Sequence, residues 1–364
     1  MKIKAAVQRA IKQPLTIEDV ELADPGPDEV LVKTVACGVC HSDLHALNGG
    51  IMLTPCPQIL GHEPAGIVQA VGERVRNVAP GDHVIACTSM FCGACTQCVQ
   101  GRPHLCTDRA ACQRAPGDAP RIHKGEEAIH QYADLAAFAE GMLLHHRAVV
   151  KIDPDIPFDR AALVGCAVTT GVGAALNTAK VEPGSSVVVF GAGGVGISII
   201  QGARIAGARQ IIAVDLNDAK LKSALTFGAT ETLNAAEPNL VKAIKKMSRG
   251  GPDYAFDAVG VPELLEQAFY CLAPHGTAVL VGAIPHGEKV SVIANHFFAE
   301  KRIIGCMMGS NRFTIDAPRY LDLYRQGRLD LDGMVTRHEP LERVGEAFRA
   351  MEAGEVTRTV LMFD

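Results

Sequence analysis

The sequence lacks any excess of positive charge. Its 364 residues include 35 lysines and arginines against 40 aspartates and glutamates, which gives a net charge of -5 and a pI near 6.2. Binding to nucleic acid requires a basic surface that neutralises phosphates, so we expect no nucleic-acid partner. The same charge balance disfavours binding to anionic membranes.

A secretory signal is also absent. The N-terminus carries charged side chains at Lys2, Lys4 and Arg9, and neither an apolar core nor a small-residue cleavage site follows them. We therefore expect a cytoplasmic protein. Two uncharged runs, 161–179 and 185–203, are long enough to span a bilayer, but Gly, Thr, Ser or Asn side chains interrupt both of them. We expect buried core segments there and no membrane span.

Internal repeats and low-complexity tracts are absent as well. What remains is the composition of a globular protein, with 48% hydrophobic and 21% charged residues. A chain of 364 residues is too long for one ordinary core, so we predict two domains of about 150 to 200 residues each.

The pattern of apolar residues changes along the chain. Residues 30–36 and 65–71 have strand-like Val and Ile content and lie between Pro-Gly turns, which predicts a barrel-like antiparallel domain. From about residue 182, short apolar runs alternate with helical stretches, which predicts a parallel sheet with crossover helices. The predicted strands are 186–190, 210–214, 254–257 and 277–281, and the predicted helices are 194–206, 217–227, 238–248 and 262–272. The tail has predicted helices at 317–326 and 341–353 and a strand at 359–362, and we expect it to return to the first domain.

The densest motif is a run of four cysteines, Cys92, Cys95, Cys98 and Cys106. Two-residue gaps let successive thiolates converge on one tetrahedral ion, and four thiolates leave no position for a substrate. Disulfides or scattered buried thiols are the alternative, but nothing in the sequence points to an oxidising compartment. We predict a structural zinc ion that stabilises a loop and takes no part in the reaction.

A glycine-rich turn joins the first strand of the parallel sheet to an apolar helix, and its residues are Gly191, Gly193, Gly194, Val195 and Gly196. In this context the first glycine permits the tight turn, the second lets the backbone approach a pyrophosphate, and the third allows close helix packing. The N-terminus of the helix attracts phosphates. The pattern predicts a dinucleotide site, although glycines that serve only a turn are the alternative.

Asp215 ends the second strand of this sheet, where an acidic side chain receives the adenosine ribose hydroxyls. Its charge would repel a 2′-phosphate, so we predict NAD over NADP. The alternative is that Asp215 caps a helix that begins near Asn217.

Three further residues of the types that bind zinc lie far apart in the sequence, at Cys40, His62 and Cys166. Each alone is more often a buried thiol or a hydrogen-bonded histidine. Together they match a catalytic zinc site of two cysteines and one histidine, which keeps one position open. An ion in such a site can bind an alcohol oxygen, lower its pKa and polarise the corresponding carbonyl.

In combination, these motifs resemble the zinc-dependent alcohol dehydrogenases of the medium-chain dehydrogenase/reductase family, and the resemblance runs from end to end. The matching motifs are Cys40-x-Ser42-Asp43-x-His45, Gly61-His62-Glu63, the four-cysteine lobe, Gly165-Cys166 followed by Thr170-Gly171, the glycine turn and Arg358-Thr359-Val360-Leu361. The resemblance implies an α/β fold made of a GroES-like β-rich catalytic domain and a Rossmann coenzyme domain with a doubly wound parallel sheet. We place the catalytic domain at 1–167 and 309–364, with the zinc lobe at about 88–107, and the Rossmann domain at 168–308.

The resemblance also implies roles at the catalytic site. Ser42 would accept the proton of the bound alcohol, and the proton would pass through the nicotinamide ribose to His45 while hydride goes to the nicotinamide. Asp43 would orient His62, and Glu63 would lie near the zinc and assist ligand exchange. Without the resemblance, a surface histidine would be the preferred interpretation of His45.

Coenzyme contacts follow from the same resemblance. His41 and Arg358 match positions that meet the pyrophosphate, Lys220 matches one near the adenosine ribose, and Thr170 and Val195 match residues beside the nicotinamide. Lys220 and Arg358 would otherwise be ordinary solvated charges. His41 stands where some relatives carry arginine, so it would hold the pyrophosphate less tightly.

Thr88 replaces an aromatic residue that narrows the substrate pocket in well-known members of the family. We therefore expect an NAD-dependent enzyme with two zinc ions that interconverts a primary alcohol, aromatic or allylic, and its aldehyde. One alternative is a dehydrogenase of a thiol–formaldehyde adduct, with Arg114 and Arg121 as anchors for the carboxylates of the thiol. The other is an NAD-binding zinc scaffold without activity. The family implies a homodimer, with a tetramer as the alternative, paired through an edge strand within residues 295–306.

Overall fold

The computed structural model describes residues 1–50, 54–115 and 117–364, which form two compact units. Unit 1 comprises Met1–Cys166, Arg312–Tyr324 and Leu331–Asp364, and unit 2 comprises Ala167–Asn311 and Arg325–Asp330. The main boundaries lie within a few residues of the division expected from the sequence. Residues 325–330 belong to unit 2, whereas the sequence predicts them in the catalytic domain.

Unit 1 is built from two sheets whose strand pairs are antiparallel except for β18 with β19 and β4 with β9. The sequence predicts a barrel-like antiparallel domain for this region. One has the strand order β8-β7-β2-β1-β4-β9, and the other has the order β11-β6-β5-β3-β19-β18 with β10 also paired to β3. The strands are β1 (Lys2–Gln8), β2 (Thr16–Leu22), β3 (Glu29–Gly38), β4 (Gln58–Ile59), β5 (Glu63–Val71), β6 (His83–Ala86), β7 (Ile122–Lys124), β8 (Glu127–Ala128), β9 (His130–Gln131), β10 (Gly141–His145), β11 (Val149–Lys151), β18 (Val335–Pro340) and β19 (Arg358–Met362). The helices are α1 (His41–Leu47), α2 (Thr96–Val99), α3 (Phe158–Leu163), α9 (Phe313–Arg325) and α10 (Val344–Glu352).

The order of the second sheet places the C-terminal strand β19 beside β3. β3 pairs with β5 on one side and with β19 on the other, both in antiparallel register. Gly38 of β3 lies opposite Glu63 of β5 and opposite Val360 of β19. The C-terminal strand is therefore part of the sheet that carries the Gly61-His62-Glu63 motif.

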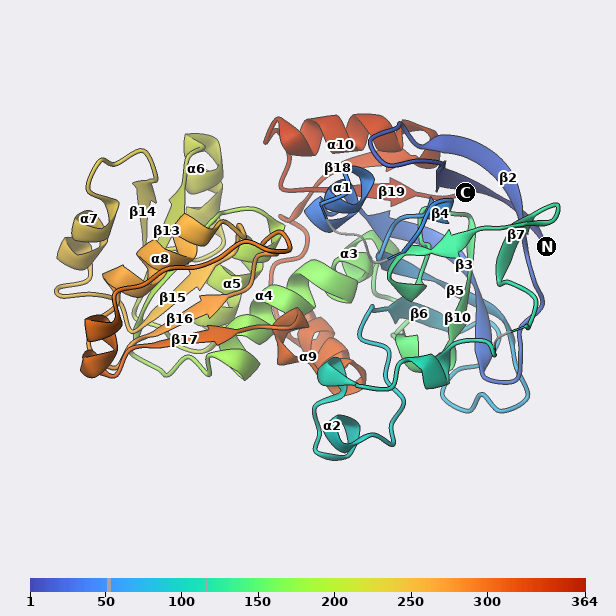
Figure 1. The fold of residues 1–364 in the computed structure, drawn as a ribbon, viewed down its shortest axis with the longest axis horizontal. Helices are drawn as coiled ribbons and strands as arrows, with labels where there is room; N and C mark the ends of the chain where they lie inside the picture. The colour runs from blue at the N-terminus through green and yellow to red at the C-terminus, as the bar shows by residue number, and fades with distance from the viewer. Residues whose placement is uncertain (51–53, 116) are drawn as a thin grey trace. The chain divides into compact units, whose positions relative to one another are not determined.

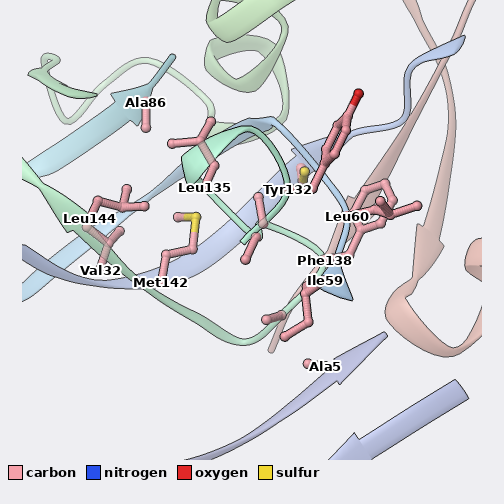
Figure 2. Packing of buried hydrophobic residues seen from close by; sticks show 14 of the residues in the cluster. Ala5, Val32, Ile59, Leu60, Ala86, Tyr132, Leu135, Phe138, Met142 and Leu144 are labelled. Atoms are coloured by element: carbon pink, nitrogen blue, oxygen red, sulfur yellow. The ribbon is translucent and has the colours of Figure 1, made fainter. Parts of the chain in front are cut away.

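The core of unit 1 lies among these strands and the segment 132–139. Figure 2 shows Leu135 and Phe138 among Ile59, Leu60 and Met142, all of which are almost completely buried. Tyr132 belongs to the same cluster, and its hydroxyl end points away from the apolar side chains (Figure 2). Apolar burial of this kind supplies about 25 cal/mol per Å² and fixes the loop that faces the His62 region.

Unit 2 contains a sheet of six parallel strands in the order β14-β13-β12-β15-β16-β17, seen side by side in Figure 1. Its strands are β12 (Ser186–Phe190), β13 (Gln210–Asp215), β14 (Glu231–Asn234), β15 (Tyr254–Asp257), β16 (Thr277–Leu280) and β17 (Arg302–Gly305). Its helices are α4 (Thr169–Gly173), α5 (Gly194–Ile205), α6 (Asp218–Thr226), α7 (Leu240–Met247) and α8 (Pro262–Cys271). The sheet confirms the parallel α/β architecture, and its order reverses beside β12, where such sheets bind their ligands.

The edge of this sheet differs from the prediction. Residues 294–299 form a short 3₁₀-helix, so the edge strand is β17 alone and not the whole stretch 295–306. The polar strand β14 was not predicted, because Glu231–Asn234 has no apolar run. Both differences lie where side chains are only partly buried, so the apolar pattern is weak.

Among the residues that the structure describes, one helical stretch, Phe158–Thr178, is long and apolar enough to cross a membrane by length and composition alone. Its most apolar window is 83% buried inside the protein, which is how core helices of soluble proteins behave. The burial agrees with the core segment expected at residues 161–179.

Candidate functional site

The four-cysteine lobe brings its sulfur atoms together. The Sγ–Sγ distances are 3.5 Å between Cys95 and Cys98, 3.9 Å between Cys95 and Cys106, and 4.0 Å between Cys92 and Cys98. A tetrahedral ion with Zn–S bonds of about 2.3 Å has sulfur–sulfur edges of about 3.8 Å. The sulfurs are therefore spaced for one zinc ion, and all four cysteines are free of disulfides.

Backbone groups prepare this lobe for a cation. The N–H groups of Ala94 and Cys95 donate to the Cys92 sulfur, and the N–H of Cys92 donates to Cys106. Hydrogen bonds from Cys98 and Thr107 lower the pKa of Cys95 to about 5. Burial raises the pKa of Cys98 to about 12, so a metal ion would have to displace that proton.

A second cluster forms within unit 1 from residues that are distant in sequence. The side chains of Cys40, His62, Glu63 and Cys166 are all buried, and one ligand atom from each lies within 4.8 Å of the others. Cys40 precedes α1, His62 directly precedes β5, and Glu63 is the first residue of β5. Cys166 lies in a π-helical turn, Val164–Val168, a distortion often found at functional sites.

Two glycines allow this convergence. Gly61 has a φ of +89°, and a Cβ there would lie 2.5 Å from the ring of Phe138, so only glycine lets His62 follow in its present position. A Cβ on Gly165 would lie 2.6 Å from the carbonyl oxygen of Ala86. Because Gly165 has no Cβ, the π-helical turn can approach β6, and Cys166 lies beside the other ligands.

Asp43 holds the His62 ring as the sequence predicts. Its Oδ1 lies 2.8 Å from His62 Nδ1 and also accepts a hydrogen bond from Gly61, while its Oδ2 accepts one from Cys40. Nδ1 is thereby committed, which leaves Nε2 for a metal ion. Burial by itself lowers the pKa of His62. The interactions with Asp43 and Cys40 raise the pKa by more than burial lowers it, and the net result is a pKa of about 10.

The two cysteines of this cluster are coupled. A hydrogen bond from Cys166 lowers the pKa of Cys40, and the same contact raises the pKa of Cys166. The two sulfurs therefore lie within reach of each other and of one shared cation. The donor set of two sulfurs and one imidazole fits zinc.

Glu63 is ion-paired to Arg358, which extends from β19. Both side chains are almost fully buried, and Gly38 makes room for them, since a Cβ there would lie 2.2 Å from Glu63 Oε2. Glu63 Oε1 and Arg358 Nε find no hydrogen-bond partner among the described residues. Arg358, expected from the sequence at a coenzyme pyrophosphate, is thus bound to the carboxylate beside the zinc ligands.

Ser42 and His45 lie on α1 and are both half-buried. Ser42 Oγ lies 3.8 Å from Cys40 Sγ, which places the hydroxyl beside the proposed ligands. His45 is near the end of the helix, and a Cβ on Gly50 would lie 3.6 Å from its Nδ1. The structure describes no contact between Ser42 and His45, so the expected relay through the coenzyme ribose stays a prediction.

Tyr132 is a residue that sequence reasoning missed. Its hydroxyl donates to the carbonyl oxygen of Ser42 at 3.1 Å, and its ring packs edge-on to His62 at 5.8 Å between centroids. The side chain is 3% exposed. An isolated tyrosine ninety positions after Ser42 gives no local signal, so only the packing reveals this contact.

The glycine turn of unit 2 lies between β12 and α5. Gly191 has a φ of +92°, and a Cβ on Gly196 would lie 1.8 Å from the carbonyl oxygen of Gly191. Gly193 precedes α5, and a Cβ there would meet nothing within 4 Å. The open space at the N-terminus of a twelve-residue helix fits a phosphate, as does the backbone of Gly194 in its first turn.

Asp215 ends β13 beside this turn. Its carboxylate accepts hydrogen bonds from the backbone N–H groups of Ala192 at 2.8 Å and Asn217 at 2.9 Å. The cap of α6 is Asn217, whose Oδ1 accepts from Ala219 and Lys220. The alternative of Asp215 as the helix cap is therefore wrong, and the carboxylate instead links the glycine turn to the start of α6.

The remaining residues expected to contact the coenzyme are divided between the two units. Thr170 lies on α4, and Gly171 lets α4 approach α5 so closely that a Cβ would lie 2.5 Å from the carbonyl oxygen of Val195. Lys220 is half-buried in the first turn of α6. His41 is the exposed first residue of α1. Unit 2 thus gathers Thr170 and Val195 near the glycine turn, while His41 and Arg358 belong to unit 1.

Arg114 and Arg121 are not available as anchors for a thiol adduct. Both donate to the buried carboxylate of Glu29, and Arg121 also donates to the carbonyl oxygen of Cys112. These ion pairs tie the segment after the zinc lobe to the start of β3. If the two arginines turned to bind a thiol adduct, the buried carboxylate of Glu29 would lose its partners at a large cost in free energy. The proposed anchoring role is therefore wrong.

Family models cover both parts of the chain. The alcohol dehydrogenase GroES-like domain matches residues 26–154, and the zinc-binding dehydrogenase model matches residues 194–325. The fold class expected from the sequence, a GroES-like domain plus a Rossmann-type domain, is confirmed by these matches.

Solved structures similar to this chain share its whole length. An alcohol dehydrogenase zinc-binding domain protein from Burkholderia ambifaria is 35% identical with a TM-score of 0.95, over 100% of this chain and 99% of the other. Benzyl alcohol dehydrogenase from Acinetobacter calcoaceticus is 31% identical with a TM-score of 0.94, over 100% of both chains. A protein from Sinorhizobium meliloti 1021, solved with NADP bound, is 28% identical with a TM-score of 0.83, again over 100% of both.

Proposed function

Since the chain belongs to the zinc-dependent alcohol dehydrogenases of the medium-chain dehydrogenase/reductase family, we propose that it interconverts a primary alcohol and its aldehyde with NAD. The observation that supports this most is the buried cluster of Cys40, His62 and Cys166. Glu63 is already paired with Arg358, which leaves three ligands for the zinc and one open position.

A zinc ion held by these three residues would polarise the substrate oxygen and lower the pKa of the alcohol. The chain supplies the proton acceptor and its surroundings. Ser42 lies beside Cys40, and Tyr132 holds the backbone of Ser42 through its carbonyl oxygen. We propose that Ser42 takes the alcohol proton and that His45 releases it to solvent.

NAD is the proposed coenzyme. Asp215 keeps its carboxylate at the end of β13, where the adenosine ribose would lie, and a 2′-phosphate there would meet a negative charge. Lys220 would lie on the same side, and the exposed Leu216 and Val259 would offer apolar contacts. The similar protein from Sinorhizobium meliloti was solved with NADP. We propose that this chain differs from that protein in its coenzyme.

Ser42 gives a direct test of the proton step. We expect Ser42→Ala to lower kcat by about 100-fold, because general acid–base groups contribute on the order of 10² or more. Ser42→Thr keeps the hydroxyl and is the matched control, with most of the activity retained. Steady-state kinetics with benzyl alcohol and NAD measure both variants, and equal rates for Ser42→Ala and the unchanged enzyme would remove Ser42 from the reaction.

The substrate is proposed to be an aromatic or allylic alcohol. Thr88 gives more room than an aromatic side chain at the same place, and one similar protein is a benzyl alcohol dehydrogenase. We expect benzyl and cinnamyl alcohols to show a kcat/KM about 10-fold or more above that of ethanol, since each buried methylene adds about 0.8 kcal/mol. A panel that also contains a thiol–formaldehyde adduct decides the matter. Preference for ethanol or for the adduct would overturn the proposal.

We also propose a cytoplasmic homo-oligomer. All twelve cysteines are free thiols, which suits a reducing compartment. β17 is the edge strand of its sheet in the part of the chain that the structure describes, and Ile293 and Phe298, a few residues before it in the sequence, are 61% and 88% exposed. A second copy paired along β17 would cover these side chains and give a dimer, and light scattering would distinguish that dimer from a tetramer.

A further inference from the structure

Arg147 packs against the loop of the four-cysteine lobe. Its Nη1 donates to the carbonyl oxygen of Phe91 at 3.3 Å, and its guanidinium lies 5.7 Å from the centre of the Phe91 ring. On the other side it covers Gly93, where a Cβ would lie 2.8 Å from Nη1 and 3.3 Å from Nη2. The guanidinium thus contacts the residues immediately before and after Cys92.

Gly93 is part of this arrangement. Its φ of +77° turns the chain so that Ala94 and Cys95 can donate their N–H groups to the Cys92 sulfur. The missing side chain leaves the space that the guanidinium fills. The same backbone therefore shapes the sulfur cluster and receives the cation.

The charge of Arg147 is not used by a carboxylate. The neighbouring arginines are paired, Arg109 with Asp134 and both Arg114 and Arg121 with Glu29. Among the residues that the structure describes, no ion pair involves Arg147. The side chain is half-buried, so its charge is screened less than that of an exposed arginine.

Four thiolates around one divalent zinc ion carry a net charge of about -2, and this charge has to be offset by nearby dipoles or cations. Backbone N–H groups donate to the sulfurs of Cys92 and Cys106. Arg147 adds a full positive charge on the loop that holds these groups.

We propose that Arg147 is a positioning residue of the four-cysteine site: it offsets the negative charge of the zinc–thiolate centre and holds the Phe91–Gly93 backbone that presents Cys92. This rests on the proposed zinc ion at that site. Arg147 lies between β10 and β11, outside the lobe. We therefore expect a residue outside the lobe to contribute to the affinity of the lobe for zinc.

The test is the rate of zinc release, measured with a colorimetric chelator on the purified full-length protein. Outer partners of metal ligands contribute about 10-fold to 100-fold to metal affinity, so we expect Arg147→Leu to release one zinc ion about 10-fold faster. Arg147→Lys keeps the charge but not the planar contact with Phe91, and we expect it to restore most of the retention. Arg102→Leu removes the same charge from an exposed position of the lobe and is the matched control, with unchanged release.

Salt separates the charge of Arg147 from its packing. Added salt screens the attraction, so release from the unchanged protein should become faster with ionic strength, and Arg147→Leu should lose most of this dependence. The salt dependence of the unchanged protein remains a test if Arg147→Leu does not fold. Equal release from Arg147→Leu and Arg102→Leu, or release from the unchanged protein that is independent of salt, would overturn the role of Arg147. Protein that never holds zinc at the lobe would instead overturn the proposed metal site.

Discussion

Replacing Cys166 with serine is expected to remove nearly all turnover while the zinc of the four-cysteine lobe remains bound. The two metal clusters share no ligand, and Cys166 belongs only to the cluster with Cys40 and His62. Serine is a poor zinc ligand at neutral pH, so this site should lose its ion. Losing about 4 kcal/mol of transition-state stabilisation lowers kcat/KM by about a thousandfold.

The control for this variant is Cys87→Ser. Cys87 is buried like Cys166 but lies outside both sets of ligands. We expect it to keep two zinc ions per chain and most of its activity, as measured by elemental analysis and by NADH formation on the same sample. A Cys166→Ser protein with one zinc ion and unchanged turnover would show that the reaction does not use this cluster.

The second large effect concerns the choice of coenzyme. We expect Asp215→Ser to raise the ratio of kcat/KM for NADP to that for NAD by about 100-fold. A carboxylate about 4 Å from a unit charge costs on the order of 4 kcal/mol at an effective dielectric constant of 20, and solvent at the ribose reduces this. Kinetics with both coenzymes at saturating benzyl alcohol measure the ratio.

The structure adds a stability cost to this substitution. The Asp215 carboxylate accepts two backbone hydrogen bonds, and each bond to a charged group contributes about 1.5 to 3 kcal/mol. A lower unfolding temperature should therefore accompany the changed preference. Asp218→Asn, a charge change in the first turn of α6, is the matched control and should leave the ratio unchanged. An unchanged ratio in Asp215→Ser would mean that Asp215 serves only to hold the glycine turn.

Much of unit 2 could be predicted because its signals are local. Buried parallel strands appear as uninterrupted apolar runs, and α5 begins at Gly194 and α8 at Pro262, as the sequence indicates. The four-cysteine lobe is equally local, since the ligands lie within fifteen positions. Each of these predictions needed only neighbouring residues.

The contacts that the sequence could not reveal are long-range. Arg358 and Glu63 are separated by 295 positions and meet only because β3 lies between β5 and β19. Arg114 and Arg121 looked like free cations, since nothing near them in sequence indicated Glu29 as their partner. Charged side chains find partners through the fold and not through periodicity, so these roles required the structure.

The most direct test of the proposed function is the formation of NADH from benzyl alcohol and NAD by the purified protein, on a sample whose zinc content has been counted. We expect two zinc ions per chain and steady NADH formation, with kcat on the order of 1–10³ s⁻¹ as in typical enzymes. Protein that contains both zinc ions and binds NAD, but produces no NADH from any alcohol of the panel, would contradict the proposal and leave an NAD-binding zinc scaffold.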